Sequence, residues 1–166
     1  MVAFLMSYFF VGDPILGVSL YDRWKNETTQ FWTAAYVRGP RYTGRDVFIL
    51  TSNQTWSAAE GFAGAMQSRK RAVVLGEKTR GGRGRAGEWY RPHPNFGIFI
   101  SKARGIDPVT GKEVSAYVMP DVAVPASDGL RTAHLMALRT LREKARDADA
   151  REFLDSAIAQ VEKSPR

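Results

Sequence analysis

The residues best suited to chemistry lie in the stretch VFILTSNQTWSAAEGFAGAM, which runs from Val47 to Met66. A short apolar run is followed by a polar loop and then by small residues at helical spacing, and Ser57 stands where the helix should begin. The first turn of a helix offers unpaired backbone N–H groups and a partial positive charge, which suit an oxyanion. Ser57 is therefore a candidate nucleophile, and the small side chain of Ala58 leaves room for a substrate backbone.

The same stretch also has a purely structural interpretation. Ser57 and Glu60 have the spacing of a capping box, in which the serine and the glutamate each bond a backbone N–H group of the first helical turn. Taken by itself, the stretch favours capping over catalysis.

The surrounding pattern predicts the elements that position Ser57. Residues 46–50 and 72–76 are short apolar runs typical of buried strands, and residues 57–69 form an amphipathic helix between them. Strand, helix and strand within about thirty residues predict a parallel crossover unit. Ligands of open parallel sheets bind beyond the carboxyl ends of the strands, which is where Ser57 lies.

The rest of the chain reads as one domain without an internal repeat. We expect a helix over residues 2–10, two short strands within 18–38 separated by a turn at 26–29, a strand at 96–100, a segment at 119–125 that closes the sheet, a long helix from about residue 127 and a last helix over 150–162. Four aromatic residues, Trp24, Phe31, Trp32 and Tyr36, either line a ligand groove or fill core space beside the sheet. Core filling is the favoured interpretation.

Composition narrows the chemistry further. The 166 residues include no cysteine and only two histidines, His93 and His134, so thiol chemistry is excluded and no metal-ligand spacing is present. The net charge is +7, and the window 69–91 holds eight basic residues against two glutamates. Such a window attracts anions or nucleic acid, but a solvated face is its commoner explanation. We predict no cofactor, no nucleic-acid partner and no transmembrane segment.

Four segments together carry a resemblance to a known family. They are ILTSNQTWSAAEGFAGAM, AVVLGEKTRGG, FGIFISKARGIDPVTGKE and VMPDVAVPASDGLRTAHLMAL, in that order. Over about 45–142 they resemble the carboxyl-terminal half of a serine peptidase family that includes the tail-specific (carboxyl-terminal-processing) proteases, the tricorn protease core and the interphotoreceptor retinoid-binding-protein modules. The resemblance implies a ClpP/crotonase-like α/β fold with a mostly parallel sheet flanked by helices. Residues 1–166 would then be a single peptidase-like domain.

The resemblance also assigns site residues. Ser57 matches the nucleophile and the backbone N–H of Ala58 an oxyanion donor, while Thr79, Gly81 and Gly82 match residues that line the site. Glu113, 56 residues after Ser57, matches the supporting glutamate of the tricorn-like branch. The implied activity is serine-type proteolysis of peptides or proteins, with the substrate's C-terminal carboxylate as a recognition handle. Bacterial members are often exported, although no export signal is present in this sequence.

Two departures bear on activity. The tail-specific branch uses a lysine base where this sequence has Gly82, and the nearby Arg80 retains its proton. The tricorn-like branch uses a histidine upstream of the serine, whereas His93 and His134 both follow Ser57. His93 is expected in a surface loop and His134 at the edge of the core.

The sequence also starts one element later than the family pattern. We therefore expect a fragment, a truncated product or one part of an assembly, in which a further segment or a second copy completes the site. The alternative function is a non-catalytic module that binds a peptide or a hydrophobic ligand in the same cleft.

Overall fold

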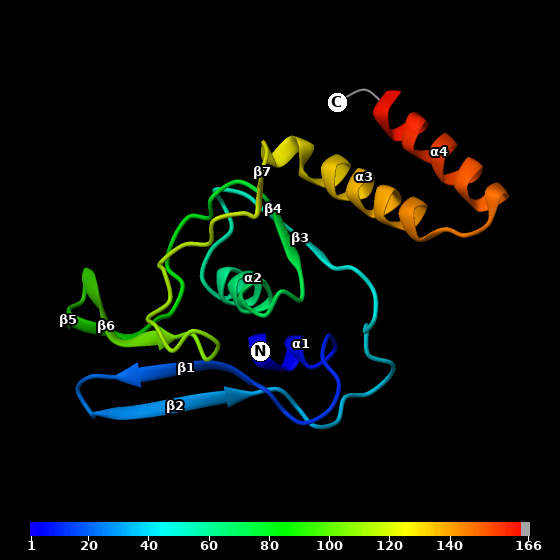
Figure 1. The fold of residues 1–166 in the computed structure, drawn as a ribbon. Coiled ribbons are helices and arrows are strands. Elements are labelled where there is room, and N and C mark those ends of the chain that lie inside the picture. Colours follow the sequence, from blue (N-terminus) through cyan, green and yellow to red (C-terminus); the bar gives the residue numbers. More distant parts are fainter. Residues whose placement is uncertain (164–166) are drawn as a thin grey trace.

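The computed structural model describes residues 1–163. Its strands form two separate sheets, a four-stranded antiparallel one in the order β2-β1-β6-β5 and a three-stranded parallel one in the order β3-β4-β7 (Figure 1). The strands are β1 (Leu16–Asp22), β2 (Glu27–Trp32), β3 (Phe48–Thr51), β4 (Val73–Gly76), β5 (Arg85–His93), β6 (Phe96–Ile106) and β7 (Val122–Ala123). The fold is mixed α/β as expected, but the larger sheet is antiparallel, so the expectation of a mostly parallel sheet is not confirmed.

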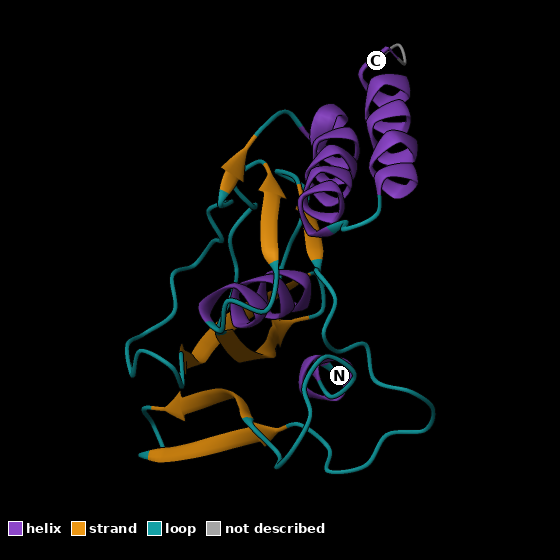
Figure 2. Cartoon of the chain, turned by 45° about the vertical axis from the view of Figure 1, so that its right-hand side comes forward, coloured by secondary structure: helices purple, strands orange, loops and turns teal. Residues whose placement is uncertain are grey.

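The crossover unit around Ser57 is present. β3 and β4 pair in parallel, and helix α2 (Ala58–Ser68) connects them. In two views α2 lies between the parallel sheet and the strands of the antiparallel sheet (Figure 1 and Figure 2). The first residues of α2 are therefore placed just beyond the carboxyl end of β3.

Helix α2 also organises the hydrophobic core. Met66 is fully buried and packs in one cluster with Met6 and Ala72, while Ala63 packs in a second cluster with Val74. Burial of a large apolar side chain contributes about 1.5–3 kcal/mol. The helix that carries Ser57 at its start is thus held on two sides by packed side chains.

The amino-terminal helix is shorter than expected. Helix α1 (Val2–Met6) ends after five residues, whereas the apolar pattern predicted a helix over residues 2–10. Ser7 Oγ donates to the carbonyl of Ala3 and accepts from the Ala34 N–H, and the Arg41 guanidinium donates to the carbonyl oxygens of Ser7 and Phe10. These bonds occupy backbone groups that a longer helix would use, so the chain turns away after Met6.

The hairpin β1–β2 turns earlier than predicted. The turn lies at residues 23–26, since β2 already begins at Glu27, and the expected turn at 26–29 is wrong. Asp22 Oδ1 accepts from the backbone N–H groups of Trp24 and Lys25, and Asn26 adopts a φ of 55°. An aspartate that bonds the backbone ahead of it, followed by an asparagine in the left-handed region, makes a tight turn.

The four aromatic residues of this region do not fill the core. Trp24, Phe31, Trp32 and Tyr36 are 60%, 42%, 51% and 80% exposed. All six residues of β2 are exposed, because β2 is an edge strand that pairs only with β1. The core-filling interpretation is therefore wrong for these side chains.

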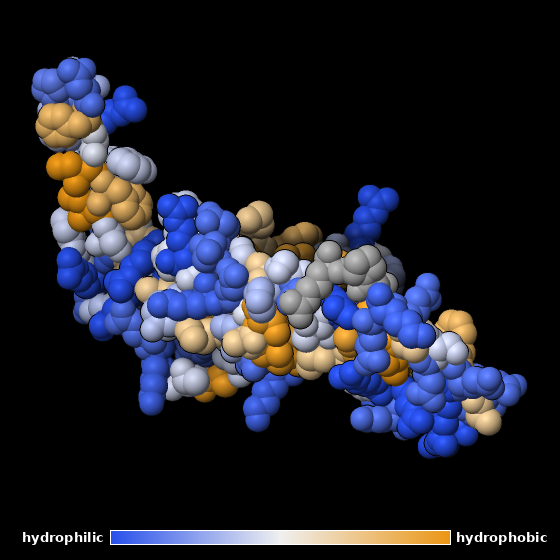
Figure 3. Space-filling view, turned by 90° about the horizontal axis from the view of Figure 1, so that it is seen from above, coloured by the Kyte–Doolittle hydropathy of each residue, from blue (hydrophilic) through white to orange (hydrophobic). Residues whose placement is uncertain are grey.

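A second hairpin was only half predicted. The strand expected at 96–100 is the first part of the longer β6, which pairs with β5 and with β1 rather than with the parallel sheet. β5 was not predicted. Several apolar residues of this hairpin are exposed, namely Trp89, Phe96, Ile98 and Phe99. Figure 3 shows such apolar patches interrupting a surface that is otherwise largely hydrophilic.

The carboxyl-terminal part is helical as expected. Helix α3 (Ala126–Lys144) packs against β3 and β4, and helix α4 (Ala148–Lys163) lies beside it. Two ion pairs, Arg139–Glu162 and Arg142–Asp155, join the helices. Among the described residues, no helix combines the length and apolarity needed to cross a bilayer.

Candidate active site

Ser57 occupies a strained position between β3 and α2. Its backbone has φ 56° and ψ −115°, a conformation that non-glycine residues rarely adopt, and the residue is exposed. A residue held in a sparsely populated region costs about 1–3 kcal/mol and persists only where its surroundings enforce it. A serine on a sharp strand-to-helix turn is also the geometry that presents a nucleophile above a sheet.

Glu60 supplies the surroundings that enforce this turn. Ser57 and Glu60 form a capping box, in which the Ser57 N–H donates to Glu60 Oε2 at 2.7 Å. The other oxygen, Oε1, accepts from Thr79 Oγ1 at 2.5 Å and from the Gly81 N–H at 2.8 Å. Glu60 is fully buried, so its carboxylate depends on these three donors.

The capping interpretation of Ser57 and Glu60 is thus present in the structure without burying the serine. Sequence reasoning gave Glu60 only a local role and missed that it joins the start of α2 to the loop that follows β4. The spacing of Ser57 and Glu60 was the one available signal, because nothing local links Glu60 to Thr79.

A cavity of about 190 Å³ opens beside Ser57. It lies between α2, β1 and the segments at 82–86 and 107–108, and three predicted site residues, Ser57, Ala58 and Gly82, line it together. Ala58 is the first residue of α2, so its N–H has no carbonyl to bond within the helix. That N–H is a suitable donor for an oxyanion at the mouth of the cavity.

Thr79 and Gly81 lie one layer behind the cavity. Thr79 is 2% exposed, donates to Glu60 and accepts from the Val118 N–H at 2.8 Å. The Gly81 N–H is also bonded to Glu60, and neither residue lines the cavity with Ser57. Both residues therefore hold the loop in place in this structure, and a direct role in lining the site stays a prediction.

Gly82 is at a position that excludes a side chain. Its φ is 132°, and a Cβ atom there would overlap the indole nitrogen of Trp56. The Arg80 guanidinium lies 5.6 Å from the centre of the same Trp56 ring. A lysine base at this position would require both a different backbone and a different place for Trp56.

Glu113 lies next to the cavity rather than in it. Its carboxylate pairs with Arg85 at 3.9 Å and with Arg104 at 3.4 Å, and its side chain is 41% exposed. Arg85 is the link, because it lines both the Ser57 cavity and the neighbouring hollow that contains Glu113. The supporting role assigned to Glu113 stays a prediction.

Neither histidine lines the Ser57 cavity. His93 lies at the end of β5, where it is exposed and stacks on Phe96. His134 is exposed on α3 in a shallow hollow with Phe9 and Leu130. Among residues 1–163, no cluster of His, Asp or Glu could hold a metal ion.

Arginines dominate the charge of the cavity. Its charged lining residues are Arg69, Arg83, Arg85 and Asp107. Burial lowers the pKa of Arg83 below its ordinary value, and the charges of Asp107 and Glu60 oppose that shift only in part. Arg83 belongs to the basic window 69–91, but Asp107 and its contact with Arg83 were not predicted, because residues 24 positions apart give no local signal of such a contact.

An exposed serine at a strand-to-helix turn, beside a cavity and an unpaired helix N–H, is an arrangement typical of hydrolases of the α/β class. The family is then identified by comparison, since the chain belongs to peptidase family S41, whose model matches residues 6–124.

Solved structures share the fold at low sequence identity. The photosystem II D1 C-terminal processing protease matches with a TM-score of 0.55 and 22% identity, over 75% of this chain and 31% of that protein. A lipoprotein from Streptococcus agalactiae matches with a TM-score of 0.59 and 16% identity, over 82% of this chain and 48% of that protein. The chain thus spans less than half the length of each of these structures.

Proposed function

We propose that the chain carries the nucleophile of a serine peptidase of the tail-specific or tricorn-like kind, with Ser57 as that nucleophile. The observation that supports this most is the exposed Ser57, held at φ 56° by Glu60 at the mouth of the cavity. Membership of family S41 makes peptides or proteins the expected substrates. The proposal includes a ClpP/crotonase-like core built around β3, α2 and β4.

The chemical steps are those of acyl transfer. Ser57 Oγ bonds to the carbonyl carbon of the scissile amide while its proton passes to a base, and the Ala58 N–H stabilises the negative oxygen. The carbon–nitrogen bond then breaks, the leaving amine takes the proton, and an acyl-serine remains. Water then gives a proton to the base and attacks the carbonyl carbon of the acyl-serine. The ester bond to Ser57 Oγ breaks, Oγ takes the proton back from the base, and the peptide leaves with its new carboxyl terminus.

The base is sought outside the cavity, because its one lining carboxylate, Asp107, accepts from the backbone N–H groups of Val109 and Thr110 and faces Arg83 at 4.0 Å. Within residues 1–163 the lining includes neither histidine nor lysine, and guanidinium groups hold their protons at every working pH. We propose that the base joins the cavity from a further segment or from a second copy of the chain, with Glu113 in support through Arg85. A labelling rate per chain that rises with protein concentration would identify the second copy as the source.

The second candidate is a non-catalytic module that binds a peptide or a hydrophobic ligand. The apolar cavity residues favour it, among them Val2, Val18, Leu20, Pro108 and Val114. In this alternative Ser57 serves only as the N-cap residue of α2.

A fluorophosphonate probe separates the two candidates, since it reacts only with an activated serine. We expect a single adduct by intact-protein mass on the wild type and none on Ser57→Ala. Ser127→Ala is the matched control, because Ser127 is also exposed near the beginning of a helix. It should label like the wild type. Folded wild-type protein that takes no label at any concentration excludes a second copy as the source of the base, and the absence of label on a longer chain that carries a further segment would contradict the nucleophile and leave the binding module.

A further inference from the structure

A second hollow, of about 610 Å³, lies on the antiparallel sheet beside the Ser57 cavity. Its charged lining residues are Arg23, Arg85, Lys102, Arg104 and Glu113, and we call it the arginine hollow. Four positive charges meet one negative charge there. The two spaces share the side chain of Arg85 and otherwise have different linings.

The strand register brings the basic side chains to one face of the sheet. Arg104 of β6 stands directly opposite Tyr21 of β1 on one side and Arg85 of β5 on the other. Opposite residues point to the same face, as do residues two positions along a strand, which adds Arg23 and Lys102. Like charges directly opposite each other destabilise a strand pair. The Arg85–Arg104 pair therefore favours an anion between its two guanidinium groups.

Glu113 is that anion in this structure, but it bridges the pair loosely. Its carboxylate lies 3.4 Å from the Arg104 guanidinium and 3.9 Å from that of Arg85, and the second distance is too long for a hydrogen bond. The Arg104 guanidinium also lies 5.1 Å from the centre of the Tyr21 ring. One planar carboxylate thus compensates two guanidinium groups only in part.

The other two basic residues differ in how they are engaged. Lys102 Nζ donates to Glu88 Oε2 at 2.5 Å, so its charge is already paired. The Arg23 side chain is exposed and makes neither a hydrogen bond nor an ion pair within residues 1–163. Three arginines therefore face one carboxylate, which leaves an excess of two positive charges in the arginine hollow.

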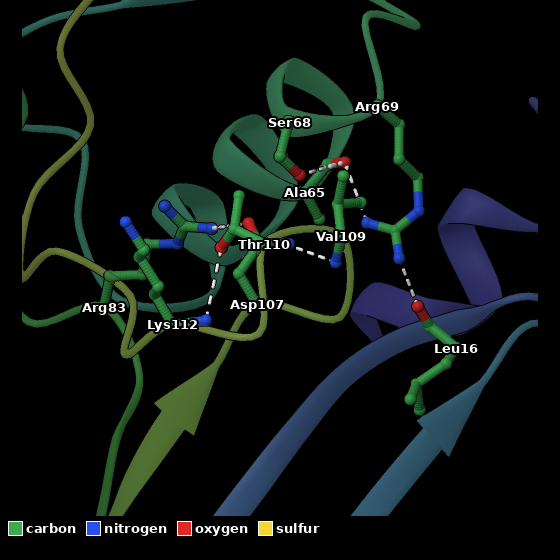
Figure 4. Close-up of polar contacts among 9 residues, drawn as sticks. All are labelled: Leu16, Ala65, Ser68, Arg69, Arg83, Asp107, Val109, Thr110 and Lys112. Carbon is green, nitrogen blue, oxygen red and sulfur yellow. Dashed lines mark hydrogen bonds and ion pairs between the residues drawn. The ribbon is translucent and has the colours of Figure 1, made fainter.

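The Glu113 side chain can leave the hollow without disturbing the fold. The loop that carries it is fixed by its backbone, because Asp107 Oδ1 accepts from the N–H groups of Val109 at 2.7 Å and Thr110 at 3.3 Å (Figure 4). The backbone of Glu113 also forms a bridge with Ile106. The side chain itself is 41% exposed, and an exposed side chain changes rotamer within nanoseconds.

We propose that the arginine hollow binds a phosphate monoester group, which takes the place of the Glu113 carboxylate between Arg85 and Arg104 and also reaches Arg23. Such a group carries a charge of about −1.5 to −2 and three free acceptor oxygens, which suit an excess of two charges and three guanidinium forks. A carboxylate offers two oxygens in one plane, which Glu113 already supplies. A phosphodiester carries only one charge. The ester belongs either to a phosphorylated peptide or to a small molecule.

Arg85 couples the arginine hollow to the Ser57 cavity, since it lines both. In the proposed function Glu113 supports the base through Arg85, so a phosphate group that draws Arg85 toward itself would change the reactivity of Ser57. That consequence rests on the proposed function. Binding of the phosphate group does not, and it is measured without labelling Ser57.

The test uses short alanine-based peptides that carry a neutral fluorophore and an amidated C-terminus. The central residue is serine, phosphoserine or glutamate, and fluorescence anisotropy in about 0.15 M salt, which screens distant charges, measures the Kd of each. The phosphoserine peptide should bind about tenfold more tightly than the other two. Inorganic phosphate should displace it. A similar Kd for the ion indicates a small-molecule ester, and a Kd at least tenfold weaker for the ion indicates a phosphorylated peptide.

Two variants with matched controls assign the preference to the arginine hollow. Arg104→Lys keeps the charge but loses the guanidinium fork, so it should lose most of the preference, whereas Arg91→Lys, at an exposed position of β5 outside the hollow, should keep it. Glu113→Gln removes the competing carboxylate and should tighten phosphoserine binding by roughly threefold. Glu27→Gln removes an exposed carboxylate of β2 outside the hollow and should change the Kd less than twofold. Urea unfolding verifies that all four variants are folded.

Several outcomes would overturn the phosphate site. They are equal affinities for the serine and phosphoserine peptides, a glutamate peptide that binds as tightly as the phosphoserine peptide, no displacement by inorganic phosphate, a preference that survives Arg104→Lys, and no tightening in Glu113→Gln. An eight-nucleotide oligothymidylate that binds more tightly than the phosphoserine peptide would assign the hollow to nucleic acid instead. Fluorophosphonate labelling of Ser57 is read independently. Labelling without a phosphate preference leaves the peptidase and removes the phosphate site, whereas a preference without labelling does the reverse.

Discussion

Thr79 Oγ1 and Glu60 Oε1 lie 2.5 Å apart, and this bond joins the first turn of α2 to the loop after β4. Thr79 is 2% exposed and Glu60 fully buried, so neither group has water as an alternative partner. Because Glu60 also accepts from the Ser57 N–H, the position of the candidate nucleophile depends on a loop about twenty residues further along the chain.

Glu60→Gln tests this dependence. The amide places an NH₂ group against donors that now meet a carboxylate oxygen, so the free energy of unfolding should fall by about 2 kcal/mol. Urea denaturation measures that loss, and the labelling rate of Ser57 should fall with it. Glu162→Gln is the control, because Glu162 is half exposed and pairs only at the surface with Arg139. Its effect should stay below about 1 kcal/mol. If the stability of Glu60→Gln were unchanged, Glu60 would not be what holds the first turn of α2 to the loop after β4.

The strain at Ser57 predicts that glycine at this position gives a more stable protein than alanine does. Ser57→Gly should be more stable than Ser57→Ala by about 1 kcal/mol, because glycine accepts φ 56° without steric cost and alanine does not. Thermal and urea unfolding of the two variants give the difference. Ser127→Gly, within α3, should be less stable than Ser127→Ala by a similar amount. The same sign at both positions would rule out strain at Ser57.

Gly76, the last residue of β4, and Gly82, which lines the cavity, should differ in their tolerance of a side chain. A Cβ on Gly76 would overlap the backbone carbonyl of Thr51, whereas a Cβ on Gly82 would meet the side chain of Trp56. Backbone in a paired strand cannot move aside as an exposed indole can. Gly76→Ala should therefore lose about 3 kcal/mol or more and Gly82→Ala about 1–2 kcal/mol, as measured by urea unfolding. The reverse order would show that the loop at Gly82 is the more rigid of the two.

A surface pair on the antiparallel sheet predicts a pH dependence. The hydrogen bond from Lys102, followed by that from Tyr90, lowers the pKa of Glu88 below its ordinary value of 4.5. A carboxylate with a folded pKa below its unfolded pKa adds stability above the unfolded pKa, and this contribution is lost as pH falls through the folded value. NMR titration should show the Glu88 pKa rising in Lys102→Gln and unchanged in Lys112→Gln. A Glu88 pKa indifferent to Lys102 would refute the pairing.

The crossover unit and the carboxyl-terminal helices could be predicted because the spacing of their apolar residues clearly distinguishes strands from helices. The apolar runs at 46–50 and 72–76 flank an amphipathic helix, and the structure has β3, α2 and β4 there. The antiparallel sheet could not be predicted in the same way. An apolar run such as FGIFI at 96–100 looks alike in either kind of sheet, and only its pairing with β5 and β1 distinguishes them.

The residues of the candidate site also differ in whether a local sequence pattern could predict them. Ser57, Ala58 and Gly82 follow from motifs, and the structure brings them to one cavity. The carboxylate of Glu60 and the fork of Arg83 act through partners about twenty residues away or more, which no local pattern specifies. The exposed aromatics of β2 were misjudged because burial of an edge strand depends on what covers it, not on its own residues.

Helix α2 forms one side of the cavity along its length, since Ser57 just before it and Arg69 just after it both line that space. A hydrogen-bonded helix advances about 1.5 Å per residue and hardly stretches, so these two points keep a constant span of roughly 18 Å. The opposite wall is a strand and a turn at 107–108, which can shift by small amounts without breaking a helix. The length of the cavity along α2 is therefore fixed, and only its width, the distance from α2 to the opposite wall, can change.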